Sequence, residues 1–522
     1  MHSLKNDILV LFVLPMGIIG IPSARAQDSG APFHPVIPET WVDSAMAALE
    51  VPLADPAASP KHVPADYYYR IPVRAIYKQY PIYAPGREPR GYMEWLERQD
   101  PVIVWDDRGH APPLRTEADW IRAGEIVFDA SPQYHGVLQV DQVRNPKWWT
   151  QVKPPLAKDG TLPGYNYVVI GKGKVELGDL SCASCHTRVM PDGTVVKGAQ
   201  GNFPFDRNTA VSLRAGLESP AAADIRQYAG FIEFDLFGAP WLKPDPQARL
   251  RDMPPEEIAS VHAAIPPGVM ARQRSSPFSP VQVADLIGVK DRRYLDRTGL
   301  QQHRSLVDLM RYAALNQGGD DLASYAGFIP ADFPNFKTLA PPAEAGFVVH
   351  GRYSDEQLYA LALYVYSLQA PSNPNRFDAS AARGQKVFQR EGCARCHAPP
   401  LYTNNKLTPA EGFTPPADAA RKYDILPVSV GTDPNLALKT RRGTGYYKVP
   451  SLKGVWYRGP FEHSGSVATL EDWFDPARLR SDYVPTGFKG YGIAHRAVPG
   501  HPFGLNLTPA DRAALIAFLK TI

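Results

Sequence analysis

Two short stretches of this chain, GDLSCASCHTRVM and GCARCHAPP, carry the same pattern, Cys-x-x-Cys followed directly by His. In this pattern the two thiols add to the vinyl groups of a haem, and the histidine takes one axial position on its iron. The sequence therefore predicts two covalently attached haem c groups, with His186 and His397 as the first ligands of the two irons. The attachment points use all the cysteines of the chain, which are Cys182, Cys185, Cys393 and Cys396.

Zinc is the main alternative to haem, because Cys-x-x-Cys pairs also form zinc ribbons. The two pairs of a ribbon lie about 15–20 residues apart. Here the pairs are separated by about two hundred residues, and each is followed by His. This spacing favours haem, and it leaves no cysteine for a disulfide or a free nucleophile.

The first residues, MHSLKNDILVLFVLPMGIIGIPSARAQ, are typical of a secretory signal peptide. Lys5 precedes an apolar stretch over residues 8–21, and Ala24-Arg25-Ala26 forms a small-residue cleavage site. The apolar stretch is shorter than the about 20 residues that a membrane-spanning helix needs. We therefore expect cleavage after residue 26 and a periplasmic or secreted mature protein without a permanent membrane anchor.

Composition excludes several other classes of function. The net charge is +3, which is too small for the basic surface that binding of nucleic acid requires. The sequence contains neither a glycine-rich phosphate loop nor a clear HExxH motif. The chain contains 53 prolines among 522 residues, and this share is about twice the average of about 5%. So much proline predicts short helices between irregular connections.

An internal repeat predicts the helix that precedes each motif. TEADWIRAGEIVFD (116–129) and DASAARGQKVFQR (378–390) share the string G-[EQ]-x-V-F, in which Gly124 matches Gly384. The second copy runs directly into its haem motif, whereas about 49 residues separate the first copy from its motif. These inserted residues contain many turn formers and one strand-like run at 165–170.

The chain also repeats a closing helix. YSDEQLYALALYVYSLQ begins with a capping box of Ser354 and Gln357, and LTPADRAALIAFLKTI begins with Thr508 and Asp511. A first helix, a haem motif and a last helix that crosses the first make up the plan of a cytochrome c domain. The expected fold is therefore mainly α, with two cytochrome c-like domains, long irregular insertions in the first, and an extended N-terminal arm. The expected divisions are the signal peptide (1–26), the arm (27–115), the haem 1 domain with its insertions (116–370) and the haem 2 domain (371–522).

Residues 446–474, YYKVPSLKGVWYRGPFEHSGSVATLEDWF, resemble the signature segment of the bacterial di-haem cytochrome c peroxidases and of the related enzyme that matures a tryptophan-derived quinone cofactor. The enlarged first domain, the YRIPVRAIYKQYPIYAPGREPRGYMEWL stretch and the GHPFGLNLTPADRAALIAFLKTI ending resemble more closely the di-haem rubber-oxygenase-like branch of this superfamily. The resemblance implies two mostly helical domains with one haem in each. It also implies that the N-terminal haem is the reactive one.

His501 is the predicted second ligand of the C-terminal iron. The peroxidases named above use a Met about 14 residues after the His of the signature segment, but here that position is Ala477 and the last methionine is Met310. His501 lies in the loop before the last helix, where a cytochrome c fold commonly supplies its sixth ligand. The rubber-oxygenase-like branch similarly uses a late His. His463 and His495 are the alternatives.

The second ligand of the N-terminal iron stays open between several residues. By the internal repeat, His350 lies before Ser354 much as His501 lies before Thr508. The other histidines and methionines available are each more typical of packing or surface positions, and they are His262, His303, Met253, Met270 and Met310. The candidates for a distal acid or base are Glu218, Glu233 and Asp235. The candidates for a tryptophan between the haems are Trp241 and Trp456.

Two classes of function remain open. In the first, the protein is a peroxidase-type or oxygenase-type oxidoreductase whose N-terminal haem binds peroxide or dioxygen and whose C-terminal haem transfers electrons. In the second, it is a non-catalytic electron-transfer protein that serves a periplasmic dehydrogenase or a respiratory partner. The first is favoured, because long insertions on a fixed frame usually build binding sites or lids. The expected partner is a redox protein or a small-molecule oxidant.

Overall fold

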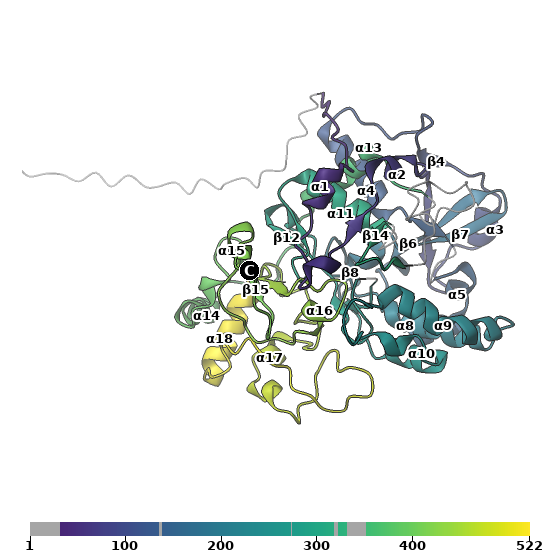
Figure 1. Ribbon diagram of the computed structural model, residues 1–522. Coiled ribbons are helices and arrows are strands. Elements are labelled where there is room, and N and C mark those ends of the chain that lie inside the picture. Colours follow the sequence, from purple (N-terminus) through teal and green to yellow (C-terminus); the bar gives the residue numbers. More distant parts are fainter. Residues whose placement is uncertain (1–31, 135–137, 273, 318–321, 331–350) are drawn as a thin grey trace, which may run out of the picture.

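The computed structural model of the chain describes residues 32–134, 138–272, 274–317, 322–330 and 351–522. The predicted signal peptide and His350 lie outside the described residues. In Figure 1 the C-terminal residues, coloured green to yellow, gather on one side of the molecule, and most of the purple-to-teal residues lie on the other. The predicted division near residue 371 lies close to this change of side and stays a prediction.

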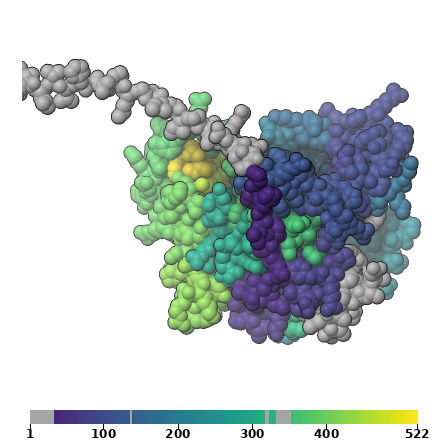
Figure 2. All heavy atoms as spheres, turned by 90° about the horizontal axis from the view of Figure 1, so that it is seen from above, coloured from purple at the N-terminus to yellow at the C-terminus, as the bar shows by residue number. Residues whose placement is uncertain are grey.

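The first described segment, residues 32–115, is packed on the body but is not extended throughout. Its elements are α1 (Asp43–Ala47), η1 (Pro56–Ala58), β1 (Lys61–His62), α2 (Ala65–Arg70), β2 (Ile76–Tyr77), β3 (Gln79–Tyr83), α3 (Tyr92–Glu97) and β4 (Ile103–Trp105). Trp41 and Tyr68 are buried, and their stacked ring centroids lie 4.3 Å apart. Figure 2 shows the start of this segment, in purple, running across the surface of the molecule. Burial of these aromatic side chains holds the segment in place.

The insertion before the first motif folds into a sheet. The elements up to the motif are α4 (Glu117–Asp129), β5 (Gln133–Tyr134), α5 (Val140–Arg144), α6 (Pro146–Val152), β6 (Thr161–Gly171), β7 (Lys174–Asp179) and α7 (Cys182–Cys185). The predicted strand at 165–170 lies within β6 and is confirmed. β6 and β7 form an antiparallel hairpin that turns at Gly173, which has a φ of 71°. With β3 and β5 they make a sheet of order β3-β6-β7-β5.

After the first motif, helices and short strands complete this side of the molecule. They are β8 (Thr187–Val189), β9 (Val195–Lys197), α8 (Phe205–Leu217), α9 (Ala222–Phe237), η2 (Ala248–Leu250), α10 (Pro255–Ala263), β10 (Val269–Met270), β11 (Val281–Gln282), η3 (Val289–Asp291), β12 (Tyr294–Leu295), β13 (Gln301–Gln302), α11 (Leu306–Gln317), β14 (Ala323–Ser324) and α13 (Asp355–Ser367). α8, α9 and α10 lie together at the edge of the molecule (Figure 1). Their apolar cluster includes Phe234, Phe237 and Ile258.

The C-terminal side is built around two helices that flank the second motif. Its elements are α14 (Ala379–Arg390), η6 (Cys393–Arg395), β15 (Leu407–Pro409), α15 (Ala419–Lys422), α16 (Asn435–Leu438), β16 (Tyr446–Lys448), α17 (Leu470–Trp473), η7 (Pro476–Leu479) and α18 (Pro509–Lys520). Phe388 on α14 and Phe518 on α18 are buried in one cluster. The cluster also contains Cys393, so the second motif is held against this helix pair.

The two matched glycines lie at two matched helix crossings. At Gly124 on α4, an added methyl carbon would lie 2.0 Å from the carbonyl oxygen of Ala360 on α13. At Gly384 on α14, it would lie 1.9 Å from the carbonyl oxygen of Ala514 on α18. The repeat is therefore a structural repeat, in which glycine lets the first and last helices touch. The predicted helix caps are confirmed at Ser354 and Thr508. Thr116 and Asp378 cap α4 and α14 in the same way.

Replacing Gly384 by alanine is expected to lower the free energy of unfolding by about 1–3 kcal/mol, because the methyl group overpacks the crossing. Gly124→Ala is expected to act in the same way. Gln385→Ala, an exposed neighbour on α14, serves as the control in denaturant unfolding. Unchanged stability in both glycine variants would show that the crossings are looser than described here.

The expected mainly α fold is correct only in part. Helices surround both motifs, but the insertion and the arm contribute the four-stranded sheet, and two-stranded sheets such as β8-β9 and β15-β16 occur elsewhere. The difference arises because β6, within the insertion, pairs with β3 of the N-terminal arm. Neither segment belongs to the internal repeat from which the helices were predicted. Within the described residues, no helix combines the length and apolar character needed to cross a bilayer.

Candidate functional site

The N-terminal centre consists of Cys182, Cys185 and His186 and occupies a single helical turn after β7. Serine is a favourable helix cap, and the Ser181 hydroxyl accepts the backbone N–H of Ser184 at 3.0 Å. The N–H of His186 donates to the carbonyl of Cys182 at 2.9 Å. The cap and this bond fix the turn that carries all three motif side chains.

Two glycines let neighbouring segments touch this turn. At Gly164 on β6, an added Cβ would lie 2.6 Å from the carbonyl oxygen of Ala183, and at Gly201 it would lie 2.0 Å from that of Cys185. Side chains at either position would push the segments off the turn. The inserted sheet therefore supports the N-terminal centre directly.

The His186 imidazole is oriented through one of its two nitrogens. Its Nδ1 lies 2.8 Å from the carbonyl oxygen of Ala284, so Nδ1–H donates and Nε2 keeps its lone pair. Burial, with the charge of Arg272, lowers the pKa of His186 to about 4. The ring is therefore neutral near pH 7, which a metal ligand requires. A hydrogen bond from the second nitrogen to a carbonyl is typical of ligating histidines.

The C-terminal centre consists of Cys393, Cys396 and His397 and follows α14 directly, as the repeat predicts. His397 Nδ1 lies 3.2 Å from the carbonyl oxygens of both Tyr402 and Pro450. Burial lowers the pKa of His397. The two centres thus share one design, in which a neutral imidazole donates Nδ1–H to backbone and keeps Nε2 for a metal.

His501, the predicted second axial ligand, lies against His397. The two ring centroids lie 6.3 Å apart. Two imidazoles that bind opposite sides of one metal through bonds of about 2 Å have ring centres about 6 Å apart. Burial and the nearby His397 and Arg478 lower the pKa of His501 to about 3, and its buried Nδ1 has no hydrogen-bond partner among the described residues. The pair therefore has the spacing and protonation that axial ligation of one iron needs.

Arg478 fixes the loop that carries His501. This arginine is fully buried. It donates to the carbonyl oxygens of Trp473 at 2.9 Å, Val498 at 2.7 Å and His501 at 2.8 Å. His501 itself has a φ of 45°, a backbone conformation that costs free energy in a non-glycine residue and needs such support. No sequence signal points to Arg478, because all its acceptors are backbone carbonyls.

The four thiols are free and partly buried. Burial raises the pKa of Cys182 to about 12 and that of Cys393 to about 11. It also raises the pKa values of Cys185 and Cys396. Without a bound group, these thiols are therefore protonated near pH 7. Among the described residues, no three His, Cys, Asp or Glu side chains come together so as to hold a metal ion.

The two alternatives to His501 lie in other surroundings. His463 stacks on Tyr447 with centroids 4.2 Å apart and forms an ion pair with Glu462. His495 is exposed. Neither residue has a ring contact with His397, whereas His501 does.

Two histidines considered for the N-terminal iron use both ring nitrogens elsewhere. His262 contacts Asp206 at 2.8 Å and Glu233 at 3.2 Å. His303 contacts the Arg292 carbonyl at 2.6 Å through Nδ1, and its Nε2 contacts the Tyr366 hydroxyl at 2.8 Å. These two residues are therefore not placed as ligands.

The candidate methionines are buried, and the two candidate tryptophans are partly buried. Met253 and Met310 belong to apolar clusters, and Met270 is buried on β10. Trp241 stacks on Tyr325 with centroids 5.0 Å apart. Trp456 packs in a small cluster that joins Val196 and Ala199, which follow the first motif, with Tyr457 of the signature segment. Of the acidic candidates, Glu233 forms an ion pair with His262, and Glu218 is the C-cap residue of α8. The backbone carbonyl of Asp235 accepts a bond from Arg441.

A small pocket adjoins the N-terminal centre. Arg272 interacts electrostatically with all three side chains of the centre, and it also lines this pocket, which has about 20 Å³ of free space. The charged and amide side chains that line it are Arg272, Arg274, Asp296, Gln301, Asn316 and Arg442. Arg442 forms an ion pair with Asp296. The remaining lining residues are Leu300, Tyr312 and Leu315, so the space beside the N-terminal centre combines cationic and apolar side chains.

Comparisons with known proteins identify similar chains but no family. No family model matches this sequence. The uncharacterized protein y4iJ of Sinorhizobium fredii (strain NBRC 101917 / NGR234) is 30% identical over 20% of this chain and 23% of its own length. The aligned part of the chain thus spans less than a quarter of that relative.

Two solved structures share a weak likeness with this fold. Hydrazine synthase of Kuenenia stuttgartiensis, pressurized with xenon, has 17% identity over 58% of this chain and 89% of that chain, with a TM-score of 0.28. A MauG-like protein associated with microbial copper homeostasis has 19% identity over 46% of this chain and 72% of that chain, with a TM-score of 0.27. At these TM-scores the likeness carries no argument about the function of this chain.

Proposed function

We propose that this chain is an exported di-haem c-type cytochrome that acts as an oxidoreductase. In this proposal the N-terminal centre holds a reactive haem that takes peroxide or dioxygen, and the C-terminal centre holds a haem that transfers electrons. The observation that carries the proposal is the opposed pair of His397 and His501, whose ring centroids lie 6.3 Å apart. This spacing has room for one iron between two neutral imidazoles.

The C-terminal centre suits electron transfer. A bound haem supplies one-electron redox chemistry and, where an axial position stays open, a site for an oxygen ligand. Cys393 and Cys396 would attach this haem, and His397 and His501 would occupy both axial positions. With both imidazoles bound to it, this haem would have no position for substrate, and the centre would supply electron transfer alone.

The N-terminal centre suits chemistry at an open axial position. His262 and His303, the described histidines considered as its second ligand, are engaged elsewhere. Arg272 offers positive charge and N–H donors beside the centre, and such groups stabilise charge that develops on an oxygen ligand. A cationic pocket favours a small polar oxidant, such as peroxide, over an apolar polymer.

The number of covalent haems tests the proposal. Protein exported from a host with an active cytochrome c maturation system is expected to contain two haems per chain that survive denaturation. The measurement is the pyridine haemochrome absorbance divided by the protein concentration, together with the intact mass. One haem per chain, or none, would contradict the two-centre assignment.

Replacing His501 by alanine is expected to open the C-terminal iron. About half of the haem absorbance should change from a six-coordinate low-spin spectrum to one that binds added imidazole or carbon monoxide. His495→Ala is the matched control, because His495 is exposed, and its spectrum should equal that of the unmodified protein. The assignment of His501 is wrong if the His501→Ala spectrum is unchanged while that of His463→Ala is altered.

A further inference from the structure

The backbone carbonyls that contact Nδ1 of the two motif histidines, His186 and His397, belong to residues that line the same pocket. We call these carbonyls the supports of the two histidines. Ala284, whose carbonyl accepts the His186 Nδ1–H, is followed by Asp285. Pro450, whose carbonyl contacts His397 Nδ1, lies in the signature segment. Ala284, Asp285 and Pro450 all line one pocket. This pocket, which we name the inter-centre pocket, therefore lies behind both imidazoles.

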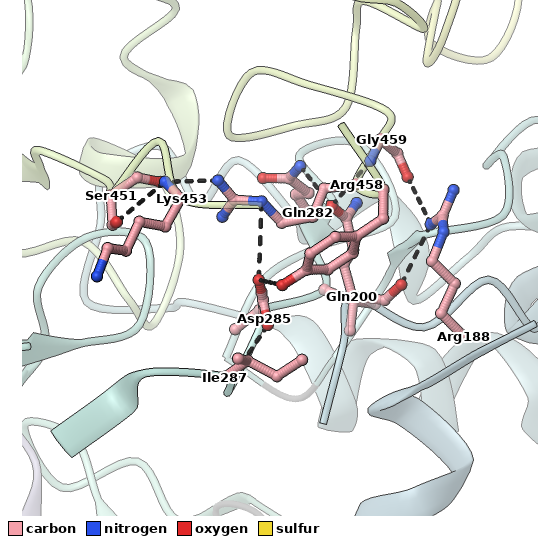
Figure 3. Close-up of polar contacts among 12 residues, drawn as sticks. Arg188, Gln200, Gln282, Asp285, Ile287, Ser451, Lys453, Arg458 and Gly459 are labelled. Atoms are coloured by element: carbon pink, nitrogen blue, oxygen red, sulfur yellow. Dashed lines mark hydrogen bonds and ion pairs between the residues drawn. The ribbon is translucent and has the colours of Figure 1, made fainter. Parts of the chain in front are cut away.

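Arg458 contacts both Asp285 and Ser451, the residues that follow Ala284 and Pro450 (Figure 3). Its Nη2 donates to the carbonyl of Ser451 at 2.8 Å, and its Nε lies 3.7 Å from Asp285 Oδ2. Asp285 also accepts the hydroxyl of Tyr457 at 3.0 Å and the backbone N–H of Ile287 at 2.9 Å. The carboxylate of Asp285 is therefore already occupied by several donors.

The inter-centre pocket has an excess of positive charge. Four cationic side chains line it, and they are Arg292, Arg297, Lys448 and Arg458. Asp285 is the one carboxylate among the described residues that line it. The formal charge of the lining is therefore +3. The pocket has about 20 Å³ of free space, whereas one water needs about 10–15 Å³.

Arg458 pairs with Asp285, whereas the other three cations have neutral hydrogen-bond partners or an unpartnered nitrogen. Lys448 Nζ donates to the carbonyl of Tyr294 at 3.3 Å, and Arg292 donates to the carbonyl of Ile287 at 2.7 Å. Arg297 Nε is buried without a hydrogen-bond partner in the described part of the chain. Burial and the neighbouring arginines lower the pKa of Lys448, and they lower that of Arg297 to about 9. Clustered cations in a desolvated pocket are costly unless an anion neutralises them.

We propose that the inter-centre pocket binds an oxyanion group, a carboxylate or a phosphate, between the supports of His186 and His397. Guanidinium groups match the geometry of both anions, and the free space suits the head group of an anion rather than a whole cofactor. The oxyanion has two possible sources. One is a propionate carboxylate of a bound haem, which rests on the proposed function, and the other is a free anion such as inorganic phosphate.

The test compares Lys448→Met with Lys453→Met in the purified holoprotein. Lys448→Met removes one pocket charge with little change in volume. Lys453 is exposed on the same segment, and its replacement is expected to change nothing. With an oxyanion in the pocket, Lys448→Met should lower the melting temperature by a few degrees. Without one, the loss of a repelled cation should leave the melting temperature unchanged or raise it, which would overturn the proposal.

Added phosphate separates the two sources. A haem carboxylate predicts that Lys448→Met is destabilised equally with and without phosphate, and that the midpoint potential of a haem falls because a positive charge is lost. A free anion predicts that phosphate raises the melting temperature of the unmodified protein and of Lys453→Met but not of Lys448→Met. Arg297→Gln should change the melting temperature in the same direction as Lys448→Met. It serves as the test variant if Lys448→Met does not fold. The haem content of each sample tests the proposed function separately, because the phosphate comparison does not need haem.

Discussion

Replacing His262 by glutamine is expected to lower the free energy of unfolding by about 3–5 kcal/mol, the cost of breaking a buried ion pair. His262 Nδ1 lies 2.8 Å from Asp206, and its Nε2 lies 3.2 Å from Glu233. All three side chains are buried. The change removes the one cation of this group and leaves two carboxylates close together. Because the group joins α8, α9 and α10, their packing should loosen first.

Denaturant unfolding of His262→Gln and of a matched control measures this effect. His110 forms a comparable contact with Asp106 at 2.9 Å, but its side chain is 58% exposed. His110→Gln is therefore expected to change stability by less than about 1 kcal/mol. Equal stabilities of the two variants would contradict the account of a buried ion group.

The same group predicts a dependence of stability on pH. Burial opposes the charged form of His262, but Glu233 and Asp206 outweigh it and raise the pKa of His262 to about 10. The unfolded value is about 6.5. The contribution of His262 is therefore fully present below pH 6.5 and is lost as the pH rises toward 10. The stability difference between the unmodified protein and His262→Gln should shrink over this range.

Replacing both cysteines of one motif by alanine is expected to remove one covalent haem and to leave the other. Cys182→Ala with Cys185→Ala should keep the C-terminal haem, and Cys393→Ala with Cys396→Ala should keep the N-terminal haem. Each double variant should therefore contain half the covalent haem of the unmodified protein by pyridine haemochrome assay. Loss of both haems from a variant that is still folded by circular dichroism would show that the centres are not independent.

The parts of the site that are local in sequence could be predicted from it. The Cys-x-x-Cys-His motifs and the caps at Ser354 and Thr508 depend on residues within a few positions of each other. The loop position of His501 followed from the order of motif and last helix. The match of Gly124 with Gly384 was visible as well, although its physical reason, contact with Ala360 and Ala514, needed the structure.

The parts that depend on distant backbone could not be predicted. The carbonyls of Ala284 and Pro450 orient the two motif histidines, yet a carbonyl leaves no trace in the identity of its residue. Arg478 likewise contacts only carbonyls. His262 was a possible iron ligand by composition, and only the fold shows that two carboxylates enclose it.

The measurement that tests the central claim most directly is carbon monoxide binding to the two single-haem variants after reduction. The variant that keeps Cys182, Cys185 and His186 is expected to bind carbon monoxide rapidly, because its iron has an open or weakly held axial position. The variant that keeps the C-terminal centre is expected not to bind, because His397 and His501 occupy both axial positions. A centre at His186 that stays six-coordinate and refuses carbon monoxide would contradict the account and identify the protein as an electron carrier.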